Sequence, residues 1–361
     1  MRWSYRSRVS TLISHPNLDL LADKCETLRQ YGLQFSRVSF QTHVQLSAMK
    51  GEVIVVTNCT NRKRVGRVDV ALGQVGTRGS LTSIAERWVK AIEKAQLSTQ
   101  ARDVYAGRAF VEARRVAAIL EGTLHIVSAG LGVVGASDFI PSYDLTVADG
   151  ANSLKPLLVR LGKDPGDWWA ALTAELGEHR SVRALLGRYS NALALFALPG
   201  SYVALIAPEL ACLTKSQVNR IRIITSGHGQ ALVPDHARHV VLPYDERLEG
   251  SSYPGTRTDF AQRALRHFIE VLDGHRLSAE EGRKAVANAM RTLKKPTIPA
   301  RTKKTDPEIL ALLRKNWSRF GGGSTRLLRY LRDEALVSCE QGRFRGLWSL
   351  LQQELAMNGK S

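Results

Sequence analysis

A tyrosine and an aspartate that follow a short apolar run are the residues of this sequence best placed to do chemistry. The run ends at Ser128 and Gly130, and a proline-stiffened loop then presents Tyr143 and Asp144. Buried parallel strands of open α/β sheets end at small residues in this way, and ligands gather at their carboxyl ends. Ser128 and Gly130 would let a ligand approach the backbone closely. The alternative is a tight turn in which Asp144 caps the next segment.

A second strand end carries polar and basic residues. The β-branched run 53–56 is followed by Asn58 and Cys59, and then by the consecutive cations Arg62, Lys63 and Arg64. Backbone donors and fixed positive charge at such a junction suit an anionic ligand. A solvated basic loop is the simpler interpretation. Cys59 could act as a nucleophile, although a small buried cysteine is the commoner role.

Four motifs within residues 50–150 form a recognisable series. They are Asn58-Cys59-Thr60-x-x-Lys63, Ala101-x-x-x-Tyr105, Ile126-Val-Ser-Ala-Gly-x-Gly132 and Ile140-Pro-x-Tyr143-Asp144. Their order resembles a family of uncharacterised bacterial α/β domains that is distantly similar to the archaeosine synthase accessory domain and to prokaryotic antiviral DNA glycosylases. The resemblance implies a nucleobase as ligand. The candidate binding residues are Asn58, Cys59, Lys63, Tyr105, Ser128, Gly130 and Tyr143.

Composition independently supports a nucleic-acid partner. The formal net charge is +18 and the isoelectric point is about 10.1, so the surface attracts polyanions before specific contacts form. Residues 276–345 hold seventeen Lys or Arg against seven Asp or Glu. DNA is the partner we expect, with RNA as the alternative. No apolar run reaches the roughly 18 residues of a bilayer span and no signal peptide is recognisable, so we expect a cytoplasmic protein without a membrane partner.

The cysteines and histidines give no metal-ligand pattern. Cys25, Cys59, Cys212 and Cys339 lie far apart in the chain, and the nine histidines show no ligand spacing. We therefore expect no metal, no disulfide and no cofactor.

The hydrophobic pattern predicts an α/β fold. Residues 53–56 and the run up to Ser128 are typical of buried strands, and residues 34–40 alternate as a further strand. Residues 81–95 and 108–120 have the apolar stripe of amphipathic helices. The expected fold class is α/β, with an open parallel sheet, single or duplicated, and a basic helical C-terminal module.

Residues 151–275 are interpreted as a helical segment followed by a second α/β lobe. A helix is expected to begin at Asp164-Pro165. Strands are expected at residues 202–207 and 221–229. A second Pro-Tyr-Asp at 243–245 indicates a duplication, two lobes that face one cleft, or chance. Asp245 is therefore a second candidate catalytic residue. A further helix begins near Arg257, and its exposed amides together with this cation suit a phosphate. Asp259, in the same first turn, is the third candidate catalytic carboxylate.

Residues 276–361 are interpreted as a separate nucleic-acid-binding module, after a basic N-terminal segment 1–50 and an α/β domain 51–150. Helices are expected at 278–293 and 306–320, followed by three glycines. The next helix carries arginines at three-residue spacing: Arg326, Arg329 and Arg332. The pattern resembles a helix-turn-helix that contacts nucleic acid, and solvated arginines are the alternative.

Two classes of function remain. The first is a DNA glycosylase that flips a modified base and hydrolyses its N-glycosidic bond, with a carboxylate that stabilises the cationic sugar and orients water. Asp144 is the first candidate for that carboxylate, Tyr143 or Tyr105 could stack the base, and Asn58 could read its edge. The second class is a non-catalytic nucleic-acid-binding protein that senses a nucleotide. Base exchange on tRNA or DNA is a third route from the same site.

Overall fold

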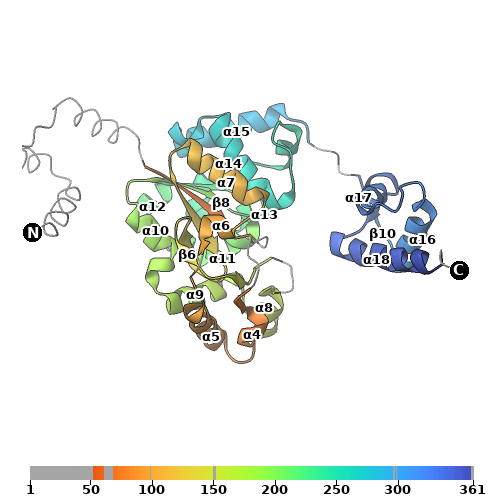
Figure 1. Cartoon of the computed structure of the whole chain (residues 1–361). Coiled ribbons are helices and arrows are strands. Elements are labelled where there is room, and N and C mark those ends of the chain that lie inside the picture. The colour runs from red at the N-terminus through yellow and green to blue at the C-terminus, as the bar shows by residue number, and fades with distance from the viewer. Residues whose placement is uncertain are drawn as a thin grey trace, which may run out of the picture. The chain divides into compact units, whose positions relative to one another are not determined.

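The computed structural model describes residues 52–60, 68–97, 99–148, 152–295, 297 and 299–358. The chain divides into a larger unit, up to Asp245 together with Gly255–Ala289, and a smaller unit of Glu246–Pro254 with the residues from Met290 onward. Figure 1 shows both. The N-terminal segment 1–50 with its expected strand, and the cations Arg62, Lys63 and Arg64, lie outside the described residues.

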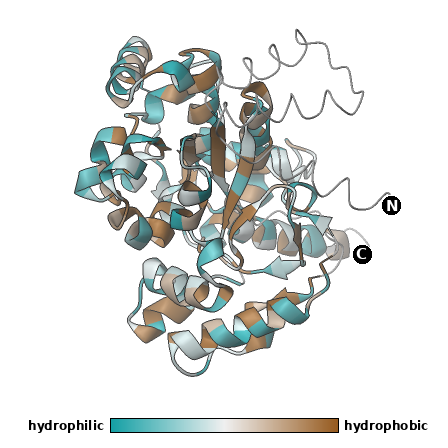
Figure 2. Ribbon diagram, turned by 90° about the vertical axis from the view of Figure 1, so that its left-hand side faces the viewer, coloured by the Kyte–Doolittle hydropathy of each residue, from teal (hydrophilic) through white to brown (hydrophobic). Residues whose placement is uncertain are grey.

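The larger unit is built on one five-stranded sheet in the order β5-β4-β1-β8-β9. Its strands are β1 (Val53–Asn58), β4 (Thr123–Ser128), β5 (Gly132–Gly135), β8 (Leu193–Ala197) and β9 (Ile221–Ile224). All neighbours pair in parallel except β5, which returns antiparallel beside β4. Every residue of β1 is buried because helices cover both faces, and Figure 2 shows the hydrophobic strands at the centre. The predicted α/β class with an open, mainly parallel sheet is confirmed.

Helices cover the two faces of this sheet. Helix α14 (Phe260–Glu270) places Gln262 against Thr57, whereas His125 of β4 faces α10 (Val182–Arg188). Thr57 pairs with Ile126, whose side chain points away from that of its neighbour His125, so α14 and α10 lie on opposite faces. Helix α7 (Arg108–Ile119) packs beside α14.

Three predicted helices of the larger unit are confirmed, and each has a clear start. Ser80 caps α5 (Leu81–Lys94) by accepting a hydrogen bond from the amide of Ser83. Asp164 caps α9 (Pro165–Leu176), whose first turn holds the proline that needs no amide partner. The helix predicted at 108–120 is α7.

The strand predicted at 202–207 is wrong. These residues lie within α11 (Gly200–Ala211), and the strand of this region is β8, which begins nine residues earlier in the stretch expected to be helical. A short run that is apolar on all sides does not distinguish a buried strand from a buried helix. Because β8 pairs with both β1 and β9, the strands assigned to two lobes share one sheet.

Short elements complete the larger unit. They are β2 (Val70–Ala71), α4 (Leu72–Val75), β3 (Thr99–Gln100), α6 (Ala101–Val104), β6 (Phe139–Ile140), β7 (Tyr143–Asp144), α8 (Lys155–Leu161), η1 (Glu178–Arg180), α12 (Lys215–Asn219), α13 (Gly227–Ala231), η2 (Asp235–Val240), η4 (Arg257–Asp259) and η5 (Gly274–Arg276). The predicted helix after Ser278 is α15 (Ala279–Thr292), and η3 (Glu246–Gly250) belongs to the smaller unit.

The smaller unit has a hydrophobic core of its own. Its helices are α16 (Asp306–Asn316), α17 (Ser324–Arg329), a π-helical continuation η6 (Tyr330–Glu334) and α18 (Gln341–Asn358), and β10 (Thr302–Lys303) pairs with β11 (Val337–Ser338). Buried apolar residues from α16, α17, η6 and α18 meet in one cluster, beside the stacked rings of Trp317 and Trp348. The expected helical C-terminal module is present, and its first helix ends earlier than predicted, at Asn316.

Candidate binding site at the carboxyl ends of the parallel strands

The strand order puts a topological switch point between β1 and β8. From β1 the chain continues to β4 on one side, and from β8 it continues to β9 on the other. Open α/β sheets bind their ligands outside the carboxyl ends of the strands at such a point, because the loops diverge there. The candidate residues after β1 and β4 are delivered to this edge.

Five side chains meet at this edge, and we name them the hydroxyl cluster: Cys59, Tyr105, Ser128, Tyr143 and Tyr202. The Tyr143 hydroxyl lies 2.7 Å from that of Tyr105 and 2.6 Å from Oγ of Ser128. Across the switch point, Sγ of Cys59 lies 2.9 Å from the Tyr202 hydroxyl. Four of these residues were predicted to bind substrate, and they come from separate segments of the chain.

The hydroxyl cluster is buried, and its phenols are uncharged at neutral pH. None of its five side chains is more than 3% exposed. Burial, with a smaller contribution from the nearby Cys59, raises the pKa of the Tyr105, Tyr143 and Tyr202 phenols well above the usual value. The phenols therefore stay protonated, and each offers one donor and an acceptor in a fixed direction.

The turn after β4 is held by aromatic side chains. Indole Nε1 of Trp88 donates to the carbonyl of Gly130 at 2.8 Å, and that of Trp168 donates to the carbonyl of Ala129 at 2.8 Å. A Cβ on Gly130 would lie 2.9 Å from the Trp88 ring and 3.0 Å from the Tyr143 ring. Gly130 is therefore required for close packing of the rings, which is a structural role at the position predicted for ligand approach.

Asn58 uses both ends of its amide inside the protein. Nδ2 donates to the carbonyl of Cys59 at 2.7 Å, and Oδ1 accepts from Nε2 of Gln262 at 2.8 Å. Gln262, which is fully buried on α14, also reaches Thr57 and the carbonyl of Ala197, so it ties β1 to β8. In this arrangement Asn58 orders the strand end, and its amide would have to release these partners to read a base.

The three candidate carboxylates lie in different settings. Asp144 is half-buried on β7 and accepts from Nδ2 of Asn152 at 2.6 Å, while its neighbour Tyr143 points into the hydroxyl cluster. Asp259 is 2% exposed and is held by Arg263 at 2.7 Å and by Arg108 at 3.5 Å, a structural ion-pair network. Asp245 follows the buried Tyr244, whose hydroxyl bonds His267.

The two Tyr-Asp motifs therefore do not share one site. Tyr143 bonds Ser128 at the end of β4, whereas the segment before Tyr244 bonds β9 through the amide of Leu242. Strands β4 and β9 are three strand spacings apart, about 14 Å. Of the three candidate carboxylates, Asp144 is the one that is adjacent in sequence to a member of the hydroxyl cluster, Tyr143.

The candidate nucleic-acid-binding arginines are not equivalent. Arg257 is exposed in η4, and Arg326 and Arg329 are exposed on α17. Arg332 is half-buried and donates to the carbonyl of Cys339 at 3.0 Å. Arg332 also lies in the π-helical turn at 330–334, whereas Arg326 and Arg329 lie on α17.

Two residues of the site were missed by the sequence analysis. Tyr202 was assigned to a strand, although the Pro199-Gly200 step after an apolar run is a usable signal for a helix start. Gln262 lies on a correctly predicted helix, but no local pattern shows that its amide reaches residues more than 60 positions away.

Other ligand chemistry is limited in the described part of the chain. No three His, Cys, Asp or Glu side chains gather there as a metal site, and Cys59, Cys212 and Cys339 are free thiols. The described helices include none with the length and hydropathy for a membrane span. In comparisons with known proteins, no family model, curated protein or solved structure matches this chain.

Proposed function

We propose that this protein is a DNA glycosylase that takes a modified base into the site above the hydroxyl cluster. The observation that carries the proposal is the convergence of Cys59, Tyr105, Ser128 and Tyr143 at the switch point of the sheet. Ligands of open α/β folds bind at this edge, and these residue types suit a polar heteroaromatic ring.

The chemistry of the cluster favours a base over a phosphate. Its phenols are protonated and its members carry no formal positive charge, so they offer hydrogen bonds without attracting an anion. Fixed donors and acceptors discriminate between bases through their edges, and a mispaired group in a buried site costs about 1–3 kcal/mol.

In this proposal, Lys and Arg side chains supply the affinity for the DNA backbone. The net charge of +18 attracts phosphates at long range. Arg326 and Arg329 are exposed in a unit with its own core, which suits sequence-independent phosphate contacts. The proposal includes a cytoplasmic location, where a nucleic-acid substrate is present.

The proposed reaction breaks the bond between the base and C1′ of the sugar. The bonding electrons leave with the base, a water molecule adds its hydroxide to C1′, and its proton goes to the base. A carboxylate stabilises the cationic sugar while the bond breaks. Asp144 is our candidate because it is only half-buried and its carboxylate accepts from the amide of Asn152, whereas Asp259 is buried in ion pairs.

The test is base release from duplexes that carry modified or unmodified bases, read as free base and as alkali-labile abasic sites. Asp144→Asn keeps the shape and the contact with Asn152 but removes the charge, so the rate should fall about a hundredfold while DNA affinity stays close to normal. Asp235→Asn, at an exposed surface position, is the matched control. Loss of DNA binding together with activity would assign Asp144 to the fold instead.

A second function, sensing of a nucleotide without catalysis, has one observation in its favour. The hydrogen bonds described for the hydroxyl cluster join hydroxyls and a thiol, and no carboxylate takes part in them. DNA binding by the wild type without base release from any substrate would favour this sensor. Uptake of a labelled free base into the DNA would indicate base exchange.

A further inference from the structure

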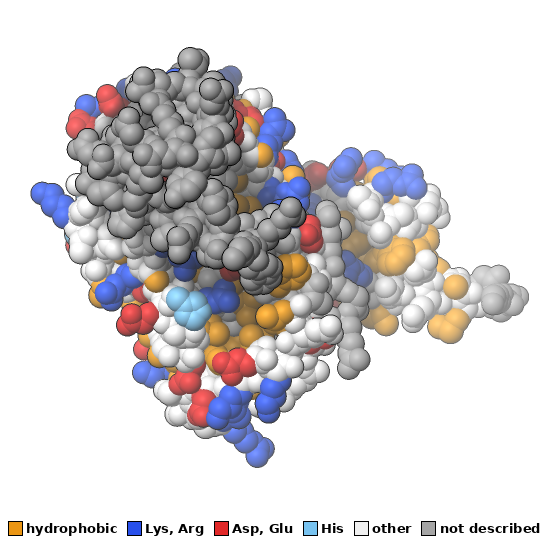
Figure 3. Space-filling model, turned by 60° about the vertical axis from the view of Figure 1, so that its left-hand side comes forward, with side chains coloured by type: hydrophobic (Ala, Val, Ile, Leu, Met, Phe, Trp, Pro, Cys, Tyr) orange, Lys and Arg blue, Asp and Glu red, His pale blue; other side chains and the backbone are white. Residues whose placement is uncertain are grey.

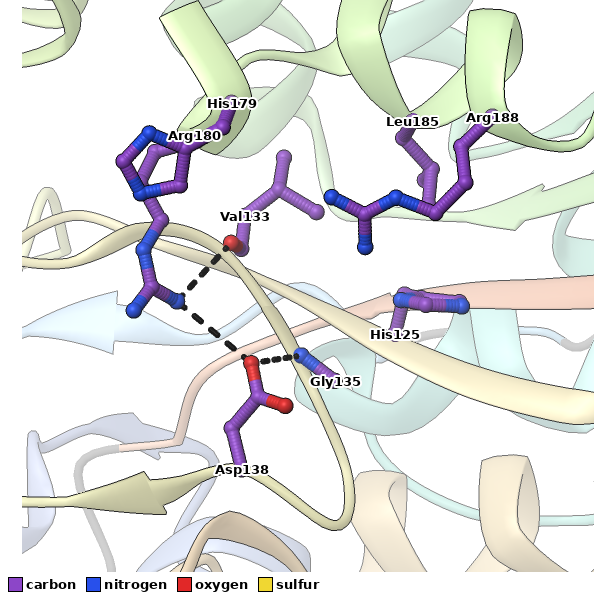
Figure 4. Close-up of a pocket in the computed structure, with 8 residues that line it drawn as sticks. All are labelled: His125, Val133, Gly135, Asp138, His179, Arg180, Leu185 and Arg188. Atoms are coloured by element: carbon purple, nitrogen blue, oxygen red, sulfur yellow. Dashed lines mark hydrogen bonds and ion pairs between the residues drawn. The ribbon is translucent and has the colours of Figure 1, made fainter. Parts of the chain in front are cut away.

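A pocket of about 250 Å³ lies beside the outer edge of the sheet (Figure 4), and its lining residues do not belong to the hydroxyl cluster. Strands β4 and β5 line one side, and the segment formed by η1 and α10 lines the other. Its volume falls below the roughly 300–1,000 Å³ of sites for drug-sized ligands, so a small group fits it best.

The charged groups of the pocket leave one cation uncompensated. Nη1 of Arg180 lies 3.4 Å from the carboxylate of Asp138, which also accepts from the amide of Gly135 at 2.9 Å. Arg188 is exposed at the end of α10, and its guanidinium makes no hydrogen bond or ion pair with the described residues. The exposed imidazole of His179 lies next to Arg180. Two guanidinium groups therefore face one paired carboxylate.

A buried histidine supplies an independent sign of a ligand. His125 is 6% exposed and lines the pocket, and its Nε2 has no hydrogen-bond partner among the described residues. Figure 4 shows the guanidinium of Arg188 above its ring. Leaving a buried polar nitrogen without a partner is costly in a folded protein, so a group that bonds it would be stabilising.

We propose that this pocket binds a phosphate group, with Arg188, Arg180 and His125 as its donors. Two guanidinium forks and an imidazole match the several acceptor oxygens of a phosphate. The charge balance of the pocket supports this choice, because Asp138 pairs with Arg180 and leaves Arg188 to attract an anion. The site is separate from the proposed glycosylase chemistry and does not depend on it.

On the face of the larger unit seen in Figure 3, Lys and Arg side chains are interspersed with Asp and Glu. A general cationic surface would bind phosphate at many places with weak, salt-sensitive affinity. The pocket is distinguished by a buried imidazole whose Nε2 has no hydrogen-bond partner among the described residues, together with the exposed guanidinium of Arg188.

The test follows the imidazole of His125 by NMR in the full-length protein, with the resonance assigned through its loss in His125→Gln. Titration with inorganic phosphate at constant ionic strength should shift it saturably, with a dissociation constant of about 1 mM or tighter. Burial, aided by the charge of Arg188, holds the pKa of His125 near 4, against the opposing effect of Asp138. Bound phosphate should raise that pKa.

Two variants on the same helix separate the pocket from general charge. Arg188→Gln should weaken phosphate binding at least tenfold, because a charge-assisted hydrogen bond is lost, whereas Arg183→Gln, outside the pocket lining, should leave it unchanged. In a parallel titration, a short oligonucleotide without terminal phosphates tests whether a phosphodiester binds in place of inorganic phosphate. A saturable shift with either probe supports the site and shows whether the bound phosphate group is free phosphate or a phosphodiester. No shift with both, or equal weakening in the two arginine variants, would overturn the proposal.

Discussion

Replacing Tyr143 by phenylalanine is the sharpest test of the hydroxyl cluster as a connected network. The hydroxyl that is removed lies 2.7 Å from Tyr105 and 2.6 Å from Ser128 in a setting that water does not reach. Ser128 keeps hydrogen bonds from the amides of Gly130 and Leu131, but the buried Tyr105 hydroxyl loses a partner. Two lost hydrogen bonds and one poorly satisfied hydroxyl should lower the free energy of unfolding by about 3 kcal/mol.

The measurement is urea unfolding followed by tryptophan fluorescence. Trp88 packs edge-on against Tyr143 with ring centroids 6.2 Å apart, so its emission reports on this part of the larger unit. The midpoint should fall while the dependence on urea stays unchanged, since the variant exposes the same surface on unfolding. Tyr189→Phe is the matched control, because the hydroxyl of Tyr189 makes no hydrogen bond with the described residues.

A double-mutant cycle decides whether the hydroxyls act together. Tyr105→Phe combined with Tyr143→Phe removes both members of the pair, so the double variant should lose about 1 kcal/mol less than the sum of the single losses. Strict additivity, or a Tyr143→Phe protein within about 0.5 kcal/mol of wild type, would refute the network.

Three further predictions concern other parts of the chain. Burial lowers the pKa of His125 from 6.5 to about 4, so as pH falls from 6.5 to 4 wild type should lose about 3 kcal/mol more stability than His125→Gln. Equilibrium unfolding at both pH values checks this, and equal losses would contradict it. Gly130→Ala should cost about 1–3 kcal/mol by pushing on neighbouring rings, seen as a lower Tm; an unchanged Tm would count against that packing. Arg326→Gln with Arg329→Gln should lower the salt slope of DNA binding by about 1.8, whereas Arg332→Gln should leave it unchanged; equal effects would show that Arg332 also contacts phosphate.

Local sequence patterns were sufficient to predict those strands and helices that have an uninterrupted apolar run or a capping residue. The run 53–56 is β-branched and uninterrupted, which predicts a buried strand, and Ser80 and Asp164 predict helix starts because a cap acts within three residues. The same reasoning found the carboxyl ends of β1 and β4 and four members of the hydroxyl cluster. Local chemistry thus identified which residues could form the site.

Long-range contacts decided the rest. An apolar run at 202–207 fits a strand or a helix equally, and only packing within the larger unit makes it α11, which brings Tyr202 to Cys59. Likewise, spacing alone put Arg332 beside Arg329, whereas the structure half-buries Arg332 in the π-helical turn, where it donates to the carbonyl of Cys339. The sequence therefore determined the α/β class, the positions of β1, β4 and β9 and of the longer helices, and the chemistry of the strand ends, because these depend on neighbours in the chain. Tertiary structure decided which ends meet, which polar groups are already bonded and which cations stay exposed, because those contacts join residues far apart in the sequence.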